Sequence, residues 1–415
     1  MERVRFRLKE KIMKLFNRLL ALVAAFALAF SLAACNKDDE ETNENLVGWA
    51  FEYKEEDVAE EDLTEGGKTK SLVIDGLFLA DGTAVSVTEE DFEAVTVAMN
   101  DSIVVADLND KDEKQYGNAD KDGKQALKTK TLSFADYDHV EIAEDAFTNQ
   151  KFIGGVEIGS AVTKIGAAAF SGCSNLKSMV LPFVGTSVDA VNGGKVLGSL
   201  FGTVEADGCT AVEMSYNASG KTSYYIPSSL ETIKVKGAAG YELPRYAFNK
   251  ISTLKTVEVA NAAKIGASAF AGCAALTKFT VTSSVTEIGD YAFSGCSALT
   301  RIDFTAASAL TKIGQNAFEN CTKLGYGKSY QLVLPASVTE IGAFAFYKCT
   351  SLKSIDISKL NVVEESCFFG CSVLETVVLK NGAILKVCSF ADCEKLDKSS
   401  LAAYSPVDEG AFGNK

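Results

Sequence analysis

Cysteine is the most reactive residue type in this sequence, because its thiolate is a nucleophile and a metal ligand. The 415-residue chain contains eleven cysteines. Seven share one position of a repeated pattern, directly before x-x-Leu: Cys173, Cys273, Cys296, Cys321, Cys349, Cys371 and Cys393. No pair has C-x-x-C spacing, and a row of once-per-repeat side chains does not converge tetrahedrally, so we predict no metal site. We expect buried free thiols that act as small core side chains.

Disulfides are the alternative to free thiols if the protein is exported. Three cysteines outside the common position bear on this choice. Cys367 takes the place of a small alanine before phenylalanine, and Cys388 lies near the same turn of the next repeat. Cys209 lies in an irregular segment and is the cysteine that we most expect to behave differently.

His139 is the only histidine, so a Ser-His-Asp or Cys-His arrangement would have to use it. No G-x-S-x-G motif accompanies it, and 55 acidic residues are too many to single out a catalytic pair. The string Asn118–Gly123 resembles the start of an EF-hand loop, but Thr129 stands where the bidentate glutamate belongs. We therefore predict a polar turn at 118–123, no catalytic residue, no cofactor and no enzyme activity.

The N-terminus has the features of an export signal. Seven basic residues precede or border an apolar run from Leu19 to Phe30, which is too short for a comfortable membrane span. The run ends in Leu32-Ala33-Ala34-Cys35, which resembles the lipobox of bacterial lipoproteins. The resemblance implies that 1–34 is a cleaved signal peptide and that Cys35 carries diacylglycerol. A plain signal peptide with an incidental cysteine is the alternative.

The tether that would follow, 35–45, is acidic. Its Asn36–Glu41 segment resembles the signal that sends Bacteroidota lipoproteins to the outer face of the outer membrane; a solvated acidic linker is the alternative. The whole chain has a net charge of −14, and loss of seven basic and two acidic residues with 1–34 would leave −19. Such a surface repels phosphate backbones, which argues against nucleic acid as a partner.

A repeated pattern, Ile-Gly-x-x-Ala-Phe-x-x-Cys-x-x-Leu, determines the architecture of the remainder. Successive phenylalanines from Phe248 to Phe412 are 22, 23, 25, 28, 22, 22 and 22 residues apart. A period of this length is typical of leucine-rich repeats. After each leucine, an alternating stretch such as Leu299–Phe304 indicates a strand, and a second strand such as Val285–Ile288 precedes each Ile-Gly. The Ala-Phe-x-x-Cys segment between them is expected to form one or two helical turns.

These segments resemble the BspA-like leucine-rich repeats of bacterial surface proteins. The resemblance covers about 138–415 and implies a leucine-rich-repeat solenoid of short strands and short helical turns in coils of 22–28 residues. The copy around Phe201 and Cys209 is expanded, so the solenoid is irregular at 183–246. No coil can bury its Phe, Cys, Ile and Leu alone, so stacked neighbours must share one core.

A recurrent glycine is typical of a position that needs a positive φ, and in this repeat a glycine follows the isoleucine. Equivalent positions of other copies hold Ala143, Pro244, Glu364 and Lys386, and proline fixes φ near −65°. We therefore predict a negative φ at this position in every coil.

Residues 46–137 carry no repeat and are expected to form a small β-rich N-terminal module or cap. Leu72–Leu79 leads through Asp81-Gly82, a hairpin signal, into a second apolar stretch. Further strands are expected at Ala94–Met99 and Ile103–Ala106.

Two rows of charge are candidate surfaces. Residues before the isoleucine of the second strand read Lys164, Lys264, Glu287, Lys312 and Glu340, and the alternating signs from Lys264 onward predict ion pairs between coils. Solubility and register are the favoured role of this row. Because strand-lined faces are where solenoids usually bind partners, the candidate ligand face is the first strand, with Lys278, Arg301, Asp303, Lys353 and Asp356.

The sequence thus favours a lipid-anchored cell-surface protein that uses its solenoid for protein binding or adhesion. The family resemblance implies host matrix proteins or other bacterial cells as partners. The alternative is a structural or accessory surface component of a glycan-handling complex, which an exposed row of aromatic side chains on one face would favour.

Overall fold

A computed structural model of the chain describes residues 47–57, 68–79, 95–106, 129–151, 153–327, 332–401 and 410–413. Cys35 and the string Asn118–Gly123 lie outside these ranges, as does the predicted turn at Asp81-Gly82. The chain divides into two compact units, the first from Met1–Glu90 with Asp101–Val140 and the second from Asp91–Asn100 with Glu141–Lys415.

The first unit is β-rich, as the sequence predicted. β1 (Val47–Asp57) pairs antiparallel with β2 (Lys68–Leu79), with a bulge between Ala50 and Phe51. β4 (Ser102–Ala106) pairs antiparallel with β5 (Thr129–Ser133), and a 3-10 turn, η2 (Phe134–Asp136), follows.

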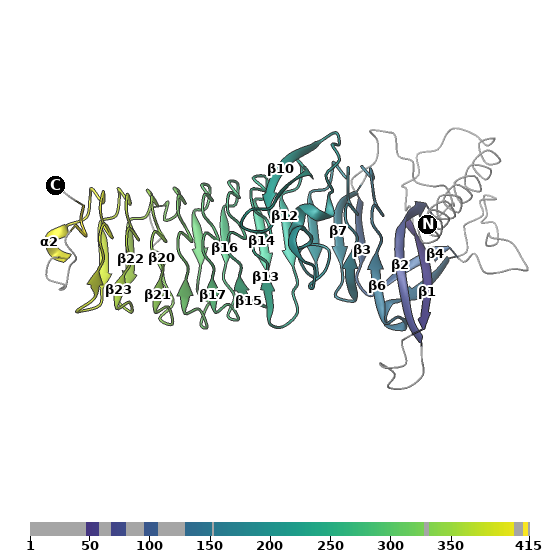
Figure 1. Cartoon of the computed structure of the whole chain (residues 1–415), viewed down its shortest axis with the longest axis horizontal. Coiled ribbons are helices and arrows are strands. Elements are labelled where there is room, and N and C mark those ends of the chain that lie inside the picture. Colours follow the sequence, from purple (N-terminus) through teal and green to yellow (C-terminus); the bar gives the residue numbers. More distant parts are fainter. Residues whose placement is uncertain are drawn as a thin grey trace, which may run out of the picture. The chain divides into compact units, whose positions relative to one another are not determined.

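The second unit is a solenoid, as predicted, and its strands form parallel ladders (Figure 1). It begins with β3 (Val95–Met99), which pairs parallel with β7 (Ile153–Ile158). The sequence placed β3 in the N-terminal module, because no repeat surrounds it. The first-strand sheet continues through β9 (Ser178–Leu181), β12 (Thr232–Val235), β14 (Thr256–Val259), β16 (Lys278–Thr280) and β18 (Arg301–Asp303). A separate sheet holds β20 (Leu332–Val333), β22 (Ser354–Ile357) and β24 (Thr376–Leu379).

The second strands form their own ladder along the same coils. β13 (Tyr241–Leu243), β15 (Ala262–Ile265), β17 (Glu287–Ile288), β19 (Lys312–Ile313) and β21 (Glu340–Ile341) lie in one sheet, in that order. β23 (Val362–Val363) pairs with β25 (Ile384–Leu385). β6 (His139–Ile142) and β8 (Val162–Ile165) are the corresponding strands of earlier coils, and α2 (Lys398–Leu401) is a short helix near the last coils.

The Ala-Phe-x-x-Cys segment forms consecutive turns instead of the predicted helical turns. Backbone N–H groups alternate between a local turn and the next coil: Cys273 donates to the carbonyl of Phe270 at 3.0 Å, whereas Phe270 donates to the carbonyl of Ala292 at 2.8 Å. Ser268 and Gly272 have φ values of 55° and 78°, which no right-handed helix contains. The turn is therefore a third ladder, because half of its donors bind the neighbouring coil.

In the five coils that have a glycine after isoleucine, the backbone of the preceding coil approaches this glycine closely. None of Gly166, Gly266, Gly289, Gly314 or Gly342 has a positive φ, and neither does Pro244, so the prediction of negative φ is confirmed. A Cβ atom on Gly266 would lie 2.4 Å from the carbonyl oxygen of Leu243 in the preceding coil. Positive φ occurs two residues later instead, as at Ser268 and Tyr291.

Two axial rows run through the core, among buried leucines, isoleucines and alanines. Phenylalanine rings of neighbouring regular coils stack with centroids 4.9 to 5.4 Å apart, from Phe248 to Phe390. Beside them, each ladder thiol donates to the carbonyl of the phenylalanine one coil earlier, as Cys296 does to Phe270 at 3.1 Å. All ten cysteines of the described residues are free, which confirms the prediction of unpaired thiols.

Candidate binding site

The predicted ligand face is exposed on the first strands, but its members are not gathered in one place. Lys278 and Arg301 are register neighbours on β16 and β18, and both side chains are exposed. Asp303 is half-buried and accepts the backbone N–H of Thr305 at 3.0 Å and its hydroxyl at 2.6 Å. These bonds lower the pKa of the Asp303 carboxyl. Its first role is therefore to terminate the strand.

The remaining two members, Lys353 and Asp356, belong to the other first-strand sheet. Asp356 accepts the N–H of Ser358 at 2.9 Å, which is the same strand-terminating bond and likewise lowers its pKa. It lies in register between Val333 and Val378, whose side chains are 59% and 44% exposed. Charge and apolar surface thus alternate across this sheet, which the sequence did not indicate.

The charge row on the second strands forms the predicted ladder. Glu287 lies 3.8 Å from the Lys264 ammonium and 3.6 Å from that of Lys312, and Lys164 pairs with Glu141 at 3.2 Å. The strand register places Lys264, Glu287, Lys312 and Glu340 side by side in successive coils. Most of these charges are therefore paired with one another within the row, which agrees with a role in keeping the strands in register.

The ladder cysteines, which belong to the most reactive residue type in the sequence, are buried in the core. Burial raises the pKa of Cys173, Cys296 and Cys393 to about 12, and thiols at such pKa values are poor nucleophiles at neutral pH. His139 is exposed. Within the described ranges, no three His, Cys, Asp or Glu side chains are grouped as a metal site.

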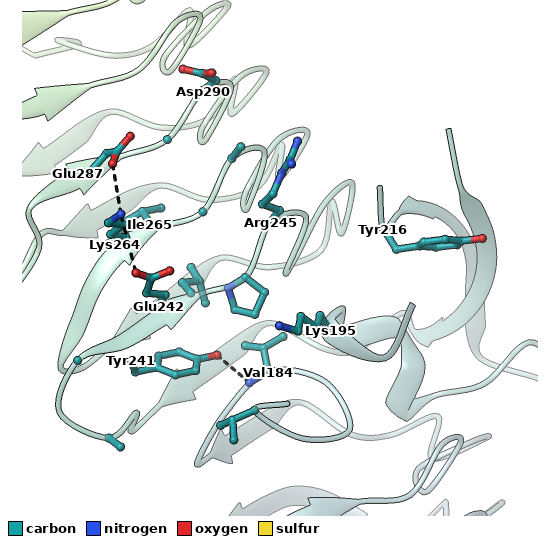
Figure 2. Close-up of a pocket in the computed structure, with 18 of the residues that line it drawn as sticks. Val184, Lys195, Tyr216, Tyr241, Glu242, Arg245, Lys264, Ile265, Glu287 and Asp290 are labelled. Carbon is teal, nitrogen blue, oxygen red and sulfur yellow. Dashed lines mark hydrogen bonds and ion pairs between the residues drawn. The ribbon is translucent and has the colours of Figure 1, made fainter. Parts of the chain in front are cut away.

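The irregular coil borders a groove of about 860 Å³ that sequence reasoning did not find (Figure 2). After β9, the chain enters a Gly-rich loop in which Thr186 accepts the N–H of Ile165 at 2.8 Å but donates its own N–H to Gly194 at 2.8 Å. The loop therefore folds back on itself and forms no second strand for the next coil. β13 consequently lies at the end of its sheet and borders the groove.

Two insertions wall the groove. One is the loop from Val184, followed by the 3-10 turns η3 (Asn192–Lys195) and η4 (Leu197–Leu200). The other is the hairpin of β10 (Cys209–Ser215) and β11 (Lys221–Pro227), whose strands pair antiparallel and whose turn carries Tyr216. In Figure 1, β10 stands out from the row of coils.

Tyr241 holds the loop against β13. Its hydroxyl oxygen accepts the backbone N–H of Val184 at 3.0 Å, as Figure 2 shows. Burial raises the pKa of this phenol to about 12, so it stays neutral and bonded at physiological pH. Between these walls, Ala238, Ala239 and Gly240 are small and exposed, and a Cβ atom on Gly240 would meet nothing within 4 Å. The groove is therefore open and rigidly bordered.

The charges around the groove are only partly compensated. Lys264 lies 3.9 Å from Glu242 and 3.8 Å from Glu287, and Asp290 accepts the N–H of Gln315 at 2.8 Å. Lys195 and Arg245 have no carboxylate partner within 4.0 Å among the described residues; Arg245 lies 5.7 Å from the ring centre of Tyr246. Among the described residues, the groove lining therefore has two cations, Lys195 and Arg245, and one carboxylate, Asp290, that lack an ion-pair partner.

A half-buried aromatic row lies on the turn side of the later coils. Tyr347 stacks on Phe369 with centroids 5.2 Å apart and contacts Phe344 at 5.8 Å, with the Lys348 ammonium 5.1 Å from its ring. The sequence signal was present, since Tyr347 and Phe369 both follow a core phenylalanine directly. The stack covers one face of each ring and the Lys348 ammonium lies over the Tyr347 ring, which reduces the flat ring surface open to a sugar.

Parallel ladders, a phenylalanine stack and consecutive turns define a leucine-rich-repeat solenoid. The chain belongs to the BspA type leucine-rich repeat family: six copies match residues 128–190, 217–328 and 326–415, more than half of the sequence. A search of curated proteins finds no match.

Solved structures of bacterial repeat proteins are similar to the chain. A leucine-rich repeat protein from Bacteroides ovatus is 20% identical, with 83% of this chain and 80% of that chain covered and a TM-score of 0.37. A Treponema pallidum leucine-rich repeat protein is 22% identical over 51% of this chain and 100% of that chain, with a TM-score of 0.32. A leucine-rich cell surface protein from Faecalibacterium prausnitzii is 18% identical, covers 83% and 95%, and has a TM-score of 0.29. None of the helices in the described ranges has the length and apolarity of a bilayer crossing.

Proposed function

We propose that the chain is an exported, lipid-anchored surface protein whose solenoid binds a protein partner and mediates adhesion to host matrix proteins or other cells. The observation that carries the proposal is the pair of parallel strand ladders, which hold exposed polar side chains at one strand spacing over successive coils. Such a surface is preorganised, so a large partner can be bound with little ordering cost. The family of repeats, typically a binding scaffold, supports the same conclusion.

The test is a binding screen with the full chain in detergent against immobilised fibronectin, fibrinogen and a glycan array. We expect saturable binding to at least one protein, and loss of it when the coils from Phe248 to Phe412 are deleted while the rest still folds by circular dichroism. Binding to glycans with none to any protein would instead favour a glycan-handling role and would refute the adhesion proposal.

The lipid anchor is a separate part of the proposal, supported by the lipobox-like Leu32–Cys35 and the acidic tether behind it. Metabolic labelling with an alkyne fatty acid should label the protein, and Cys35→Ser should remove the label and the membrane association. Cys209→Ser is the matched control and should keep both. A labelled Cys35→Ser protein would place the lipid elsewhere. Surface proteolysis of intact cells tests the outer-face location.

A further inference from the structure

The groove beside the irregular coil has a free strand edge. Among the described strands, β13 pairs only with β15, and Glu242 aligns with Lys264. Carbonyls of alternate residues in a parallel ladder point to opposite neighbours. Since the Ile265 carbonyl accepts from Gly289 in the following coil, the Lys264 carbonyl points back toward β13. The Glu242 carbonyl, in the same register position, therefore points away from β15 and into the groove.

Pro244 fits this edge. In later coils the residue after the second strand donates its N–H to the preceding coil, as Gly289 does to Ile265 at 2.9 Å and Gly314 does to Ile288 at 2.8 Å. The coil of Pro244 has no second strand before it, and proline has no N–H to leave unsatisfied. Proline at an edge also prevents continuous strand addition. The edge therefore offers one backbone acceptor, the Glu242 carbonyl, to a short segment but no template for aggregation.

The side chains that line the groove carry a small excess of positive charge, with four cations against three carboxylates. Lys195 is half-buried in one wall, and Arg245 is exposed directly after Pro244. Neither has a carboxylate partner among the described residues, whereas Lys264 lies between two glutamates. Val188, 54% exposed, adds an apolar contact on the loop wall. A ligand that satisfies all three features needs N–H donors, carboxylates and an apolar side chain in one extended chain.

We propose that this groove binds a short, extended, acidic segment of the protein partner. The inference rests on the proposed function and adds to the strand ladders of the later coils one further contact site for the partner. A partner N–H donates to the outward Glu242 carbonyl of β13, the partner's carboxylates pair with Lys195 and Arg245, and an apolar side chain packs on Val188. An acidic glycan would satisfy the cations but not the strand edge, which is why a peptide is the better fit.

The probe is the fluorescein-labelled peptide Thr-Val-Glu-Val-Asp-Val-Glu-Thr, titrated with the full chain in detergent and followed by anisotropy. Its control has glutamine and asparagine in place of the acids. We expect Lys195→Gln and Arg245→Gln each to weaken binding roughly three- to tenfold. Ala239→Trp, which fills the groove without changing charge, should weaken it at least as much. Lys323→Gln removes an exposed lysine that lies outside both strand ladders and the groove, and it should change nothing.

The outcomes separate the groove from the function. Equal affinity for the neutral peptide, or unchanged affinity in both charge variants, overturns the acidic-segment proposal. If a matrix protein binds wild type and both variants equally, the groove proposal fails and the proposed function stands; if nothing binds at all, both fail. Polygalacturonate binding without peptide binding overturns the proposal in favour of an acidic glycan. Should Ala239→Trp not fold, the two glutamine variants still decide.

Discussion

The regular coils from Ile265 to Leu396 and the irregular coil at 183–246 use the same inward-facing residue types with opposite results. In the regular coils, each turn donates to the next coil, each ladder thiol binds the preceding phenylalanine carbonyl, and each second strand is paired on both sides where its sheet continues. In the irregular coil, Thr186 pairs with Gly194 in its own loop, and the strand that would cover β13 is missing.

A repeat protein can acquire a specific site where one of its coils departs from the repeat. Uniform coils satisfy most of their own backbone groups and charges, and the hollow between Leu334 and Leu360 on their surface is only about 120 Å³. One loop that bonds to itself removes one strand, and that single omission produces a groove, a strand edge and two uncompensated cations. If this is correct, the regular coils resist unfolding and chemical modification, whereas the irregular coil is accessible.

The largest expected effect is loss of stability of the regular coils at alkaline pH. Burial raises the pKa of Cys296 to about 12, against about 8.5 for an unfolded thiol. Between these values the unfolded chain has released a proton that the folded chain keeps, so rising pH favours unfolding. Each such thiol removes about 1.4 kcal/mol of unfolding free energy per pH unit. Urea denaturation at about pH 8, 9 and 10 measures the slope; an unchanged midpoint would contradict the thiol ladder.

The same thiols separate the two regions by reactivity. Cys209 of the irregular coil and Cys388 are half-buried, whereas all seven ladder thiols are buried. In the native chain, a thiol reagent at neutral pH should modify Cys209 and Cys388 before any ladder cysteine, with the sites assigned by mass spectrometry. Early modification of Cys321 would show that the regular coils open more readily than the structure implies.

Truncation of the phenylalanine stack is expected to be the most damaging single substitution. Phe293 lies between Phe270 at 4.9 Å and Phe318 at 5.3 Å and is fully buried. Phe293→Ala should cost about 3–5 kcal/mol, because it removes the ring and leaves a cavity shared by three coils. Tyr326→Ala, at a 69% exposed side chain, is the control and should stay within about 0.5 kcal/mol. Urea denaturation measures both.

A methyl group on glycine compares close packing with conformational freedom. Gly266→Ala would place Cβ 2.4 Å from the Leu243 carbonyl in the adjoining coil, so the two backbones must separate. We expect a loss of about 2–3 kcal/mol from this overpacking. Gly240→Ala in the irregular coil meets no atom within 4 Å and has only its φ of 80° to oppose it, which costs about 1–2 kcal/mol. The reverse order in thermal denaturation would contradict the assignment of the glycine to backbone contact.

The sequence predicted the structural features that recur in every regular coil, and the prediction failed where one coil departs from the repeat. Period, alternation and the Phe-x-x-Cys spacing gave the two strand ladders, the free buried thiols and the charge row, because each follows from one coil being stacked on another. Proline at one copy correctly excluded a positive φ for Gly266. The Ala-Phe-x-x-Cys turns were wrongly predicted to be helical. The sequence of a single segment does not reveal that half of its backbone N–H groups donate to the next coil.

The candidate site was less predictable for the same reason. Asp303 and Asp356 looked like ligand-facing charges, but Thr305 and Ser358 two residues later are the signal for a strand-terminating bond. The groove needed the path of the loop after Val184 and the pairing of Thr186 with Gly194, neither of which has a periodic signature. Pro244 was the one clue, because only an unpaired edge tolerates the loss of that N–H.

The smallest expected effect concerns the charge row of the regular coils. Glu287 lies between Lys264 at 3.8 Å and Lys312 at 3.6 Å, and these side chains are one-third to one-half exposed. Glu287→Gln should cost about 0.5–1 kcal/mol at low salt, since it removes both pairs and leaves two lysines adjacent. In about 1 M NaCl, where the Debye length is ~3 Å, the difference from wild type should nearly vanish. Glu375→Gln breaks one pair of 4.0 Å between more exposed side chains and should cost less. Equal effects of the two variants would mean that the row adds nothing beyond isolated surface pairs.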